Sequence, residues 1–250
     1  MEKQHQEKPA KQKTTETNVA KSPQQNVVVI IPAYNEQKTI ATAVSNALPY
    51  ADAIVVVNDG SVDATLSKVL ALRRQSSECK KKLHVLSHVI NLGKGATLTT
   101  GIEYARASLA PDYLVLMDAD LQHQATDIPK FLKALKNADI VFGYRTYSKT
   151  MPLVFRLGNK GLNFFVWLLY GISIPDTQCG FRAMKASVYP KIQWQSTKYS
   201  VESEMIAKTA KAGLSYALVP IPTIYHEAYK GTTVIDGIKI LFNMLLWKIK

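Results

Sequence analysis

Cysteine is scarce in this chain, and acidic residues are outnumbered by basic ones. The two cysteines, Cys79 and Cys179, lie far apart and form no CxxC pair, so neither a disulfide framework nor a cysteine zinc site is expected. This favours a reducing, cytoplasmic environment. No apolar run reaches the roughly 20 residues that a membrane span needs, and no charged-then-apolar leader marks a secretory signal.

Two common nucleotide-binding patterns are also missing. The turn Gly93-Lys94-Gly95 does not satisfy GxxxxGK[ST], and it lacks the third glycine of GxGxxG. ATP hydrolysis and a dinucleotide cofactor are therefore not expected. A helix N-terminus with two glycines and a lysine can still face an anion, and a simple flexible turn fits equally well.

What the chain does have is positive charge and enough apolar residues for one large core. Thirty-one Lys and Arg against 19 Asp and Glu leave a net charge of +12, and 47% of the residues are hydrophobic. Such a charge suits a phosphate ligand, an anionic membrane or a nucleic acid. No aromatic-rich basic motif accompanies it, so no nucleic-acid partner is expected.

Three stretches of different composition divide the chain. Residues 1–25 are polar and nearly free of large apolar side chains, which predicts a disordered tail. Residues 26–233 are expected to form one folded domain. Residues 234–250 predict an amphipathic helix that either lies in a membrane interface or docks on the core. The apolar stretch 162–174 is too short to span a membrane and predicts a buried or interfacial helix.

Strand and helix signals alternate from residue 27 to residue 117. The expected strands are 27–31, 54–57, 83–89 and 113–117, and the expected helices are 40–48, 66–73 and one that opens at 91–95. Gly60 permits a tight turn after the second strand, and Ser61 is expected to cap the helix that follows. This order predicts a parallel, doubly wound α/β sheet.

The strand 113–117 ends in two carboxylates, Asp118 and Asp120. In an open parallel sheet, ligands bind beyond the carboxyl ends of the strands, so both side chains should stand at the mouth of a site. Two close carboxylates repel each other unless a cation neutralises them, and their hard oxygens suit Mg²⁺ or Mn²⁺. A polar exit from the strand is the simpler alternative.

Several separate stretches, in order, resemble the family 2 glycosyltransferases of the GT-A fold, and within them the dolichol-phosphate mannose synthase or polyprenyl-phosphate glycosyltransferase type. The stretches are 31–36 (IPAYNE), 58–63 (NDGSVD), 91–95 (NLGKG), 118–123 (DADLQH), 143–145 (GYR) and 176–182 (DTQCGFR). The resemblance implies a Rossmann-like, mostly parallel central sheet with helices on both faces, followed here by the amphipathic C-terminal segment. It also implies an enzyme that transfers one hexose, with inversion, from a nucleotide-sugar to dolichyl or polyprenyl phosphate.

The resemblance assigns residues to the donor and to a Mg²⁺ or Mn²⁺ ion. The implied nucleotide-sugar residues are Pro32, Ala33, Tyr34, Glu36, Asp59, Lys94, Asp118 and Ala119, and the implied metal ligands are Asp118, Asp120 and Gln122. A metal would neutralise charge on the departing diphosphate. His123 receives no catalytic role, because a histidine beside an acidic pair is more often a hydrogen-bond partner.

On the acceptor side, the resemblance implies that Arg145, Arg156 and Lys160 hold the lipid phosphate. That phosphate is already an anion at neutral pH, so cations and positioning matter more than a general base. Asp176 is expected to orient an arginine or a sugar hydroxyl. The residues expected to carry catalysis are therefore Asp118, Asp120, Arg145 and Asp176; Glu202 and Glu204 fit a helix N-terminus.

The donor is left open by one departure from the family pattern. Members of the mannose synthase group usually carry an arginine where this chain has Ala228, and Lys230 or His226 could replace it. GDP-mannose leads, and UDP-glucose and UDP-N-acetylglucosamine fit the same scaffold. A saccharide acceptor, with Asp176 as base, or a non-catalytic nucleotide-sugar binder are the rival hypotheses.

The expected partners are the nucleotide-sugar, the polyprenyl or dolichyl phosphate and a membrane surface. A small membrane-anchoring protein is a further candidate. With no spanning segment, the protein is expected to attach peripherally to the cytoplasmic face of a membrane.

Overall fold

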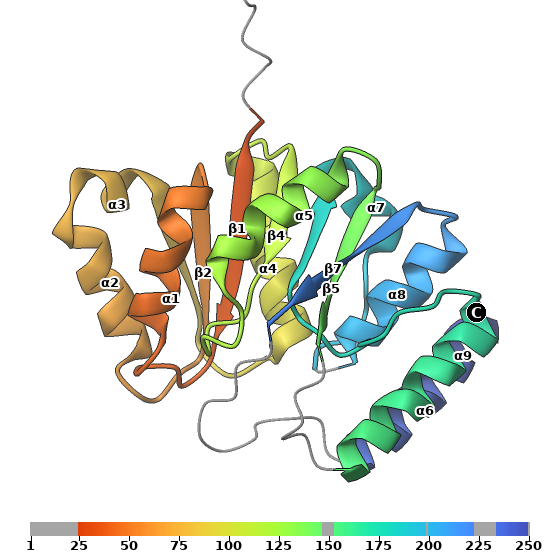
Figure 1. Cartoon of the computed structure of the whole chain (residues 1–250). Coiled ribbons are helices and arrows are strands. Elements are labelled where there is room, and N and C mark those ends of the chain that lie inside the picture. Colours follow the sequence, from red (N-terminus) through yellow and green to blue (C-terminus); the bar gives the residue numbers. More distant parts are fainter. Residues whose placement is uncertain (1–24, 147–152, 199, 223–233, 250) are drawn as a thin grey trace, which may run out of the picture.

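A seven-stranded sheet runs through the part of the chain that the computed structural model describes, which is residues 25–146, 153–198, 200–222 and 234–249. Its strand order is β3-β2-β1-β4-β6-β5-β7 (Figure 1). The strands are β1 (Val27–Ala33), β2 (Ala53–Asp59), β3 (Leu83–His88), β4 (Tyr113–Leu116), β5 (Ile140–Arg145), β6 (Arg182–Lys185) and β7 (Tyr216–Ile221). Within this sheet only β6 is antiparallel to its neighbours, β4 and β5.

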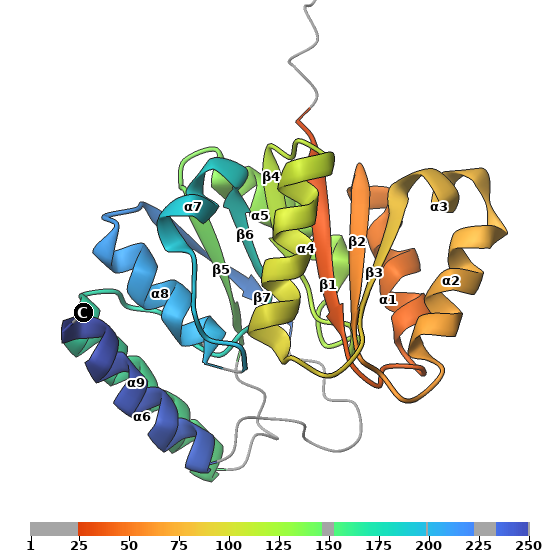
Figure 2. The same ribbon diagram turned by 180° about the vertical axis from the view of Figure 1, so that it is seen from behind.

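Helices cover both faces of the sheet (Figures 1 and 2). One face carries α1 (Ile40–Ala47), α2 (Thr65–Gln75) and α5 (Ile128–Leu135), with α3 (Ser77–Lys82) at the β3 edge. The other face carries α4 (Lys94–Ser108), α7 (Tyr189–Ile192) and α8 (Val201–Lys211). Two longer helices, α6 (Leu153–Tyr170) and α9 (Val234–Ile249), pack side by side beyond α8. Short 3₁₀ turns occupy Leu48–Tyr50, Ala125–Asp127 and Ala186–Val188.

The core lies in two layers, one on each side of the sheet. Along β1, Val29 and Ile31 face the layer under α1 and α5, whereas Val28 and Ile30 face the layer under α4. All four side chains are fully buried, which is why this strand reads as an unbroken apolar run. On α4, a Cβ at Gly101 would lie 2.6 Å from Cγ2 of Ile30, so the glycine lets the helix approach the sheet closely.

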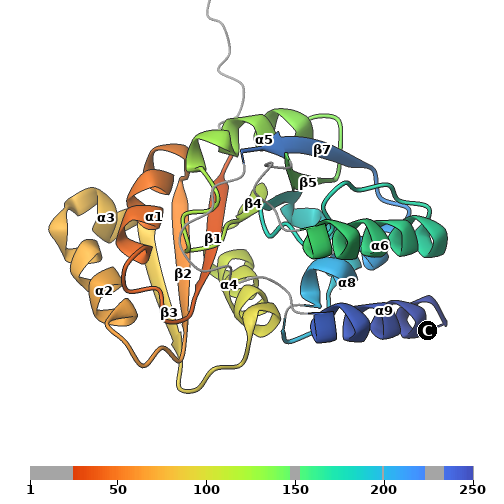
Figure 3. The ribbon, with the colours of Figure 1, turned by 60° about the horizontal axis from the view of Figure 1, so that its bottom comes forward.

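The carboxyl ends of β1, β2, β4 and β5 lie at the same end of the sheet, which Figure 3 brings forward. From β1 the sheet extends to β2 and β3 on one side and to β4 on the other. Ligands of open α/β sheets bind at such a change of direction. The stretches 31–36, 58–63, 118–123 and 143–145 lie at these strand ends or just beyond them.

The fold confirms the expectation of a mostly parallel α/β sheet with helices on both faces, and the structure adds one reversal and one correction. The antiparallel strand β6 was not expected. The expectation that Ser61 caps the next helix is wrong: α2 begins at Thr65, and Ser61 Oγ instead accepts a hydrogen bond from Asn35 N at 3.0 Å. Among the described residues, no helix has the length and apolarity of a membrane span.

Candidate active site

An ion-paired lysine lies at the end of β4. Lys94, the first residue of α4, places its Nζ 2.6 Å from Asp118 Oδ1 and 2.8 Å from Glu202 Oε1. The side chains of Lys94 and Glu202 are 17% and 5% exposed, so the ammonium is largely shielded from water. Three elements thus converge here: the N-terminus of α4, the end of β4 and the first turn of α8.

Electrostatics hold the charges of this group in place. Burial alone would lower the pKa of Lys94, but the charges of Asp118 and Glu202 outweigh it, and the pKa lies above its ordinary value. Burial alone would raise the pKa of Asp118, yet the charge of Lys94 brings it below the usual range. The two residues therefore meet as an ammonium and a carboxylate at neutral pH.

Backbone packing fixes the Lys94–Asp118 pair from the other side. A Cβ at Gly180 would lie 2.5 Å from Asp118 Oδ2 and 2.6 Å from Lys94 Nζ, so any larger residue would displace the charged ends of this pair. The loop that carries Gly180 is held by the buried Arg182, which donates to the carbonyl oxygens of Thr177 (2.9 Å) and Cys179 (3.0 Å). Arg182 Nη1 also donates to Glu202 O at 2.6 Å, and this ties the loop to the start of α8.

The turn after Asp118 presents the second carboxylate. Leu121 has a φ of 64°, and this left-handed turn lets Gln122 N donate to Asp120 Oδ1 at 3.0 Å. The buried His123 accepts from Asp118 N through Nδ1 at 3.1 Å. Burial lowers the pKa of His123, so the ring is neutral and acts as a hydrogen-bond partner of the turn.

The donor set at this turn fits a hard divalent cation. Within the described ranges, no group of three or more His, Cys, Asp or Glu side chains is arranged to hold a metal ion by itself. Asp118 and Asp120 supply carboxylate oxygens, and among the described residues the side chain of Asp120 accepts one hydrogen bond, which uses a single oxygen. Mg²⁺ is usually bound by one or two carboxylates together with substrate phosphates, so the residues present fit it.

A second ion pair lies at the end of β5. Arg145 Nε donates to Asp176 Oδ2 at 2.6 Å, and its Nη2 donates to Asp176 Oδ1 at 3.1 Å. Asp176 is only 4% exposed. Asn163 of α6 donates to Pro175 O and accepts from Thr177 N at 3.4 Å, so it brackets the aspartate and links α6 to this loop.

The residues expected to line the donor follow β1, and they differ in exposure. Tyr34 is 45% exposed, Pro32 and Glu36 are half-buried, and Ala33 and Ala119 belong to the buried core. The side chains of the two alanines therefore face away from a ligand, so any contact they make would use their backbones.

Hydrogen bonds join the loop after β1 to the loop after β2. Asn35 has a φ of 55°, and its Oδ1 accepts from Val62 N at 3.0 Å. Gln37 N donates to Asp63 Oδ2 at 3.1 Å, and Glu36 N donates to Thr65 Oγ1 at 2.8 Å. The two loops thus form one rigid wall beside the site.

Asp59 is used by the protein itself. Its carboxylate accepts from Leu92 N at 2.9 Å and Gly93 N at 2.8 Å, and Oδ1 lies 2.7 Å from His88 Nδ1. Burial alone would raise the pKa of Asp59, but the bonds from Leu92, His88 and Gly93 lower it. A contact with a base or ribose would have to replace one of these bonds.

The start of α8 supports the same region. Glu204 accepts from Gln195 N at 2.9 Å and Ser196 N at 2.8 Å. The loop held in this way passes so close to α4 that a Cβ at Gly95 would clash with Ser196 O. Trp194 Nε1 donates to Gly95 O at 2.9 Å and locks the contact. The second glycine of the 93–95 turn is therefore a packing requirement.

Some expected residues lie outside what the structure describes. Arg156 and Lys160 fall on α6, but their side chains are not described, and neither are Ala228, Lys230 and His226. Their roles stay predictions. Sequence reasoning missed the Lys94–Glu202 pair and the packing of Gly180; an acidic residue at a helix start was the only signal for the first.

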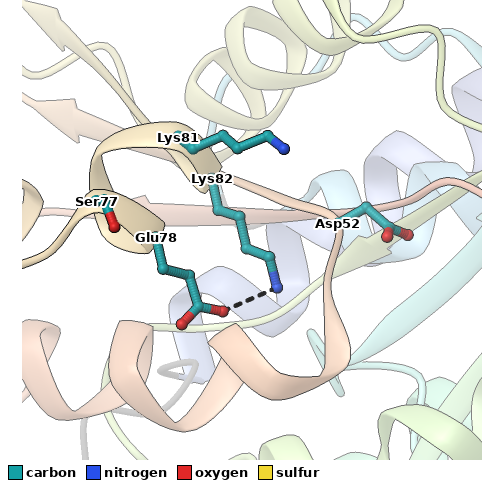
Figure 4. Close-up of a pocket in the computed structure, with 5 residues that line it drawn as sticks. All are labelled: Asp52, Ser77, Glu78, Lys81 and Lys82. Carbon is teal, nitrogen blue, oxygen red and sulfur yellow. Dashed lines mark ion pairs between the residues drawn. The ribbon is translucent and has the colours of Figure 1, made fainter.

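A hollow of about 540 Å³ lies at the other end of the strands, beside the start of β2. Its lining residues are Asp52, Ser77, Glu78, Lys81 and Lys82 (Figure 4). Lys82 Nζ is paired with Glu78 Oε1 at 3.2 Å. No residue expected to bind donor, metal or acceptor lines it, so this hollow does not belong to the candidate site.

Comparisons with known proteins identify the family of this chain. The family model described as Glycosyl transferase family 2 matches residues 28–193. An uncharacterized protein of Methanocaldococcus jannaschii is 39% identical over 237 residues, covering 89% of this chain and 92% of its own. A UDP-N-acetylglucosamine–dolichyl-phosphate N-acetylglucosaminyltransferase of Methanococcus voltae is 34% identical, covering 89% of this chain and 96% of its own.

The fold has solved counterparts. In the crystal structure of glucosyl-3-phosphoglycerate synthase from Mycobacterium tuberculosis, determined with Mn²⁺, UDP and glucosyl-3-phosphoglycerate, the chain superposes with a TM-score of 0.68. The match covers 90% of this chain and 80% of the synthase at 19% identity, so the likeness is one of fold.

Proposed function

Since the chain belongs to glycosyl transferase family 2, we propose that it transfers one sugar, with inversion, from a nucleotide-sugar to the phosphate of a polyprenyl or dolichyl lipid. One observation carries this proposal: the acidic turn Asp118–Asp120 follows β4, the ion-paired Arg145 ends β5, and both strands have their carboxyl ends on the same side of the sheet. A diphosphate would be handled through the carboxylates, and an acceptor phosphate through the arginine.

On the donor side, Asp118 and Asp120 would hold Mg²⁺ or Mn²⁺ against the diphosphate, with Gln122 as a third ligand. When bound, such a cation neutralises the charge that develops on the departing nucleoside diphosphate. The Mycobacterium tuberculosis synthase with the same fold holds Mn²⁺ and UDP, which supports this choice of ion. The wall formed by residues 34–37 and 61–65 would flank the nucleotide, and Tyr34 offers an exposed ring to it.

On the acceptor side, Arg145 would hold the lipid phosphate, with Arg156 and Lys160 on the first turns of α6 as its expected companions. A bidentate aspartate fixes the arginine fork, so the guanidinium is positioned before the lipid arrives. A phosphate oxygen needs no base to attack. The rival use of Asp176 as a base toward a sugar hydroxyl is less suitable, because both of its oxygens already accept from Arg145.

The proposed donor is a UDP- or GDP-linked sugar. Sequence reasoning put GDP-mannose first, and relatives named as mannosyltransferases are 28% and 29% identical. The Methanococcus voltae relative named for UDP-N-acetylglucosamine is 34% identical over nearly its whole length, so UDP-N-acetylglucosamine now leads. Dolichyl-phosphate β-glucosyltransferases of animals, at 28% to 30% identity, keep UDP-glucose in the comparison.

The proposed attachment is peripheral, on the cytoplasmic face of a membrane. Among the side chains that the structure describes, α6 and α9 expose seven large apolar ones, here termed the α6–α9 face: Phe164, Phe165, Trp167, Leu168, Phe242, Leu245 and Leu246. On each helix these residues fall within one arc, as 100° per residue requires. In sequence, α6 contains no acidic residue and α9 contains one, against two basic residues on each.

Helices that combine exposed apolar side chains with lysine and arginine in their sequence suit the interface of an anionic bilayer. Because Asn163 ties α6 to the loop of Asp176, a membrane under this face would bring lipid phosphates near Arg145. Both free cysteines are buried, which is compatible with a reducing compartment. Neither the structure nor the comparisons support the small anchoring protein.

Three labelled donors separate these possibilities. The full chain is incubated with UDP-N-acetylglucosamine, GDP-mannose or UDP-glucose, together with polyprenyl phosphate and Mg²⁺ or Mn²⁺. Label that extracts into organic solvent with one donor supports the proposal and identifies that donor. Label transferred only to an added saccharide would point to the rival acceptor, and binding without turnover of any donor would refute transfer to the lipid.

A further inference from the structure

Lys94 forms an ion pair with one of the two carboxylates that we propose as metal ligands. Its Nζ lies 2.6 Å from Asp118 Oδ1, at the carboxylate that we propose as a metal ligand. An ammonium at this distance neutralises the aspartate and repels a second cation. For a divalent ion to use Asp118 fully, the contact between Lys94 and Asp118 must open.

Glu202 offers the displaced ammonium a place to go. Glu202 is 4% exposed, and its Oε1 lies 2.8 Å from Lys94 Nζ. Its other oxygen, Oε2, is buried and has no hydrogen-bond partner among the described residues. An unsatisfied buried carboxylate oxygen is costly, and an ammonium has three donors, so Lys94 could engage both oxygens of Glu202 after leaving Asp118.

We propose that Lys94 is the resting counter-ion of Asp118 and that Glu202 receives it when a divalent cation takes Asp118. The inference rests on the proposed function, because it needs Asp118 as a metal ligand. Gly180 packs on the pair and Arg182 holds Glu202 O at 2.6 Å, so the backbones around Lys94 stay fixed while its Nζ shifts. Glu202 is thus a positioning residue for Lys94.

Charge and contact can be separated with three variants. Lys94→Met removes the competing ammonium. Glu202→Gln keeps Asp118 as a charged partner of Lys94 and removes the charge of the other. Lys94→Met combined with Glu202→Gln keeps the net charge of the group unchanged and frees Asp118 from its contact. The double variant also avoids the unpaired buried glutamate that could unfold the single Lys94 variant.

Binding of Mn²⁺ alone to the full chain, followed by the electron paramagnetic resonance signal of free Mn²⁺, tests the proposal without donor or lipid. We expect the double variant to bind Mn²⁺ about tenfold more tightly than the unaltered chain and Glu202→Gln to bind it several-fold more weakly, as a charge a few ångströms away dictates. Equal affinity of the double variant and the unaltered chain would overturn the proposal, because net charge alone would then explain binding.

Two controls separate this inference from the metal assignment itself. Lys185→Met removes an ammonium that lies 3.1 Å from Asp139 Oδ1, where β5 begins at the opposite edge of the sheet, and should leave Mn²⁺ affinity unchanged. Asp120→Asn should abolish binding. If Asp120→Asn binds Mn²⁺ like the unaltered chain, the proposed metal site fails. If Asp120→Asn loses Mn²⁺ binding but the Lys94 and Glu202 variants bind Mn²⁺ like the unaltered chain, the metal site stands and the counter-ion role fails.

Discussion

Arg145 and Asp176 form a two-pronged ion pair that joins the end of β5 to the loop before β6, with N–O distances of 2.6 and 3.1 Å. Arg145 N also donates to Asp176 Oδ2, at 3.3 Å, so the aspartate fixes both the backbone and the guanidinium. A lysine cannot reproduce this planar fork. The pair therefore orients a cation for the acceptor and closes the loop around it.

Asp176→Asn should lower kcat/KM for the lipid phosphate by about 100-fold, because the guanidinium loses its charged anchor. Arg145→Lys, which keeps the charge and loses the fork, should show a smaller loss, measured by transfer at varied lipid concentration. Equal activity of Asp176→Asn and the unaltered enzyme would exclude the pair from the acceptor site.

Asp120→Asn should abolish transfer while the fold is kept. The side chain of Asp120 accepts one intramolecular bond, from Gln122 N, and an asparagine oxygen can still accept it. The thermal midpoint should therefore move by no more than about 2 °C, as for a surface substitution. Radiolabel transfer and circular dichroism melting test the two halves of this prediction; retained transfer contradicts the metal assignment.

Gly180→Ala should reduce transfer at least tenfold with little loss of stability. The added Cβ would lie 2.5 and 2.6 Å from the far ends of Asp118 and Lys94, and these flexible ends can shift, but only away from their present geometry. Gly161→Ala is the matched control: no contact within 4 Å of its Cβ is found among the described residues, and alanine in α6 should stabilise the helix by about 0.5–1 kcal/mol. Full activity of Gly180→Ala would show that the pair tolerates displacement.

Substituting the α6–α9 face should release the protein from anionic vesicles. Phe164→Ser with Leu168→Ser, at positions 54% and 58% exposed, should weaken binding about tenfold without unfolding. Trp167 lies on the same face and is 54% exposed, so its fluorescence should shift to shorter wavelength when anionic vesicles are added. Val62→Ser, at an 88% exposed position outside the face, is the control and should bind normally. Unchanged binding of the serine pair would assign the face another role.

Asp139 should contribute stability at neutral pH that disappears in acid. Bonds from Ser215 and then Lys185 lower its pKa to about 2 from 3.8. Because the folded pKa is the lower one, the contribution is complete above the unfolded value and is lost as pH falls through the folded value. Asp139→Asn should cost roughly 1 kcal/mol at pH 6, after allowance for partial exposure, and almost nothing near pH 2. Urea unfolding at both values tests this; an equal cost at both would remove the carboxylate as the cause.

The sequence predicted the first half of the sheet well because its signals are local. The strands β1, β2 and β4 are short apolar runs, and the helices between them repeat apolar residues at helical spacing. The strand β6 gave no such signal: it is the four residues Arg182–Lys185, and its position depends on pairing with β4 and β5. Antiparallel insertion of this kind is a property of the whole sheet.

The candidate site was predictable as a set of positions but not as a set of contacts. Asp118 and Asp120 stood out by type and by their place after an apolar run, and the resemblance implied Arg145 and Asp176. The contact between Lys94 and Glu202 joins two helix starts far apart in the chain, and no local pattern reports it. Likewise, Asp59 was expected to face a nucleoside, whereas its oxygens here accept from Leu92 N and Gly93 N.

The reversed strand β6 also governs the order in which the polypeptide can assemble during synthesis. Strands β2, β3 and β4 can pair as they leave the ribosome, since each finds its partner, β1 or β2, among residues already made. β5 differs: within the described part of the chain it pairs with β6 and β7 alone, and both are translated later. A nascent chain that ends before residue 182 therefore carries an unpaired β5, and a ribosomal pause in that interval would expose it to aggregation.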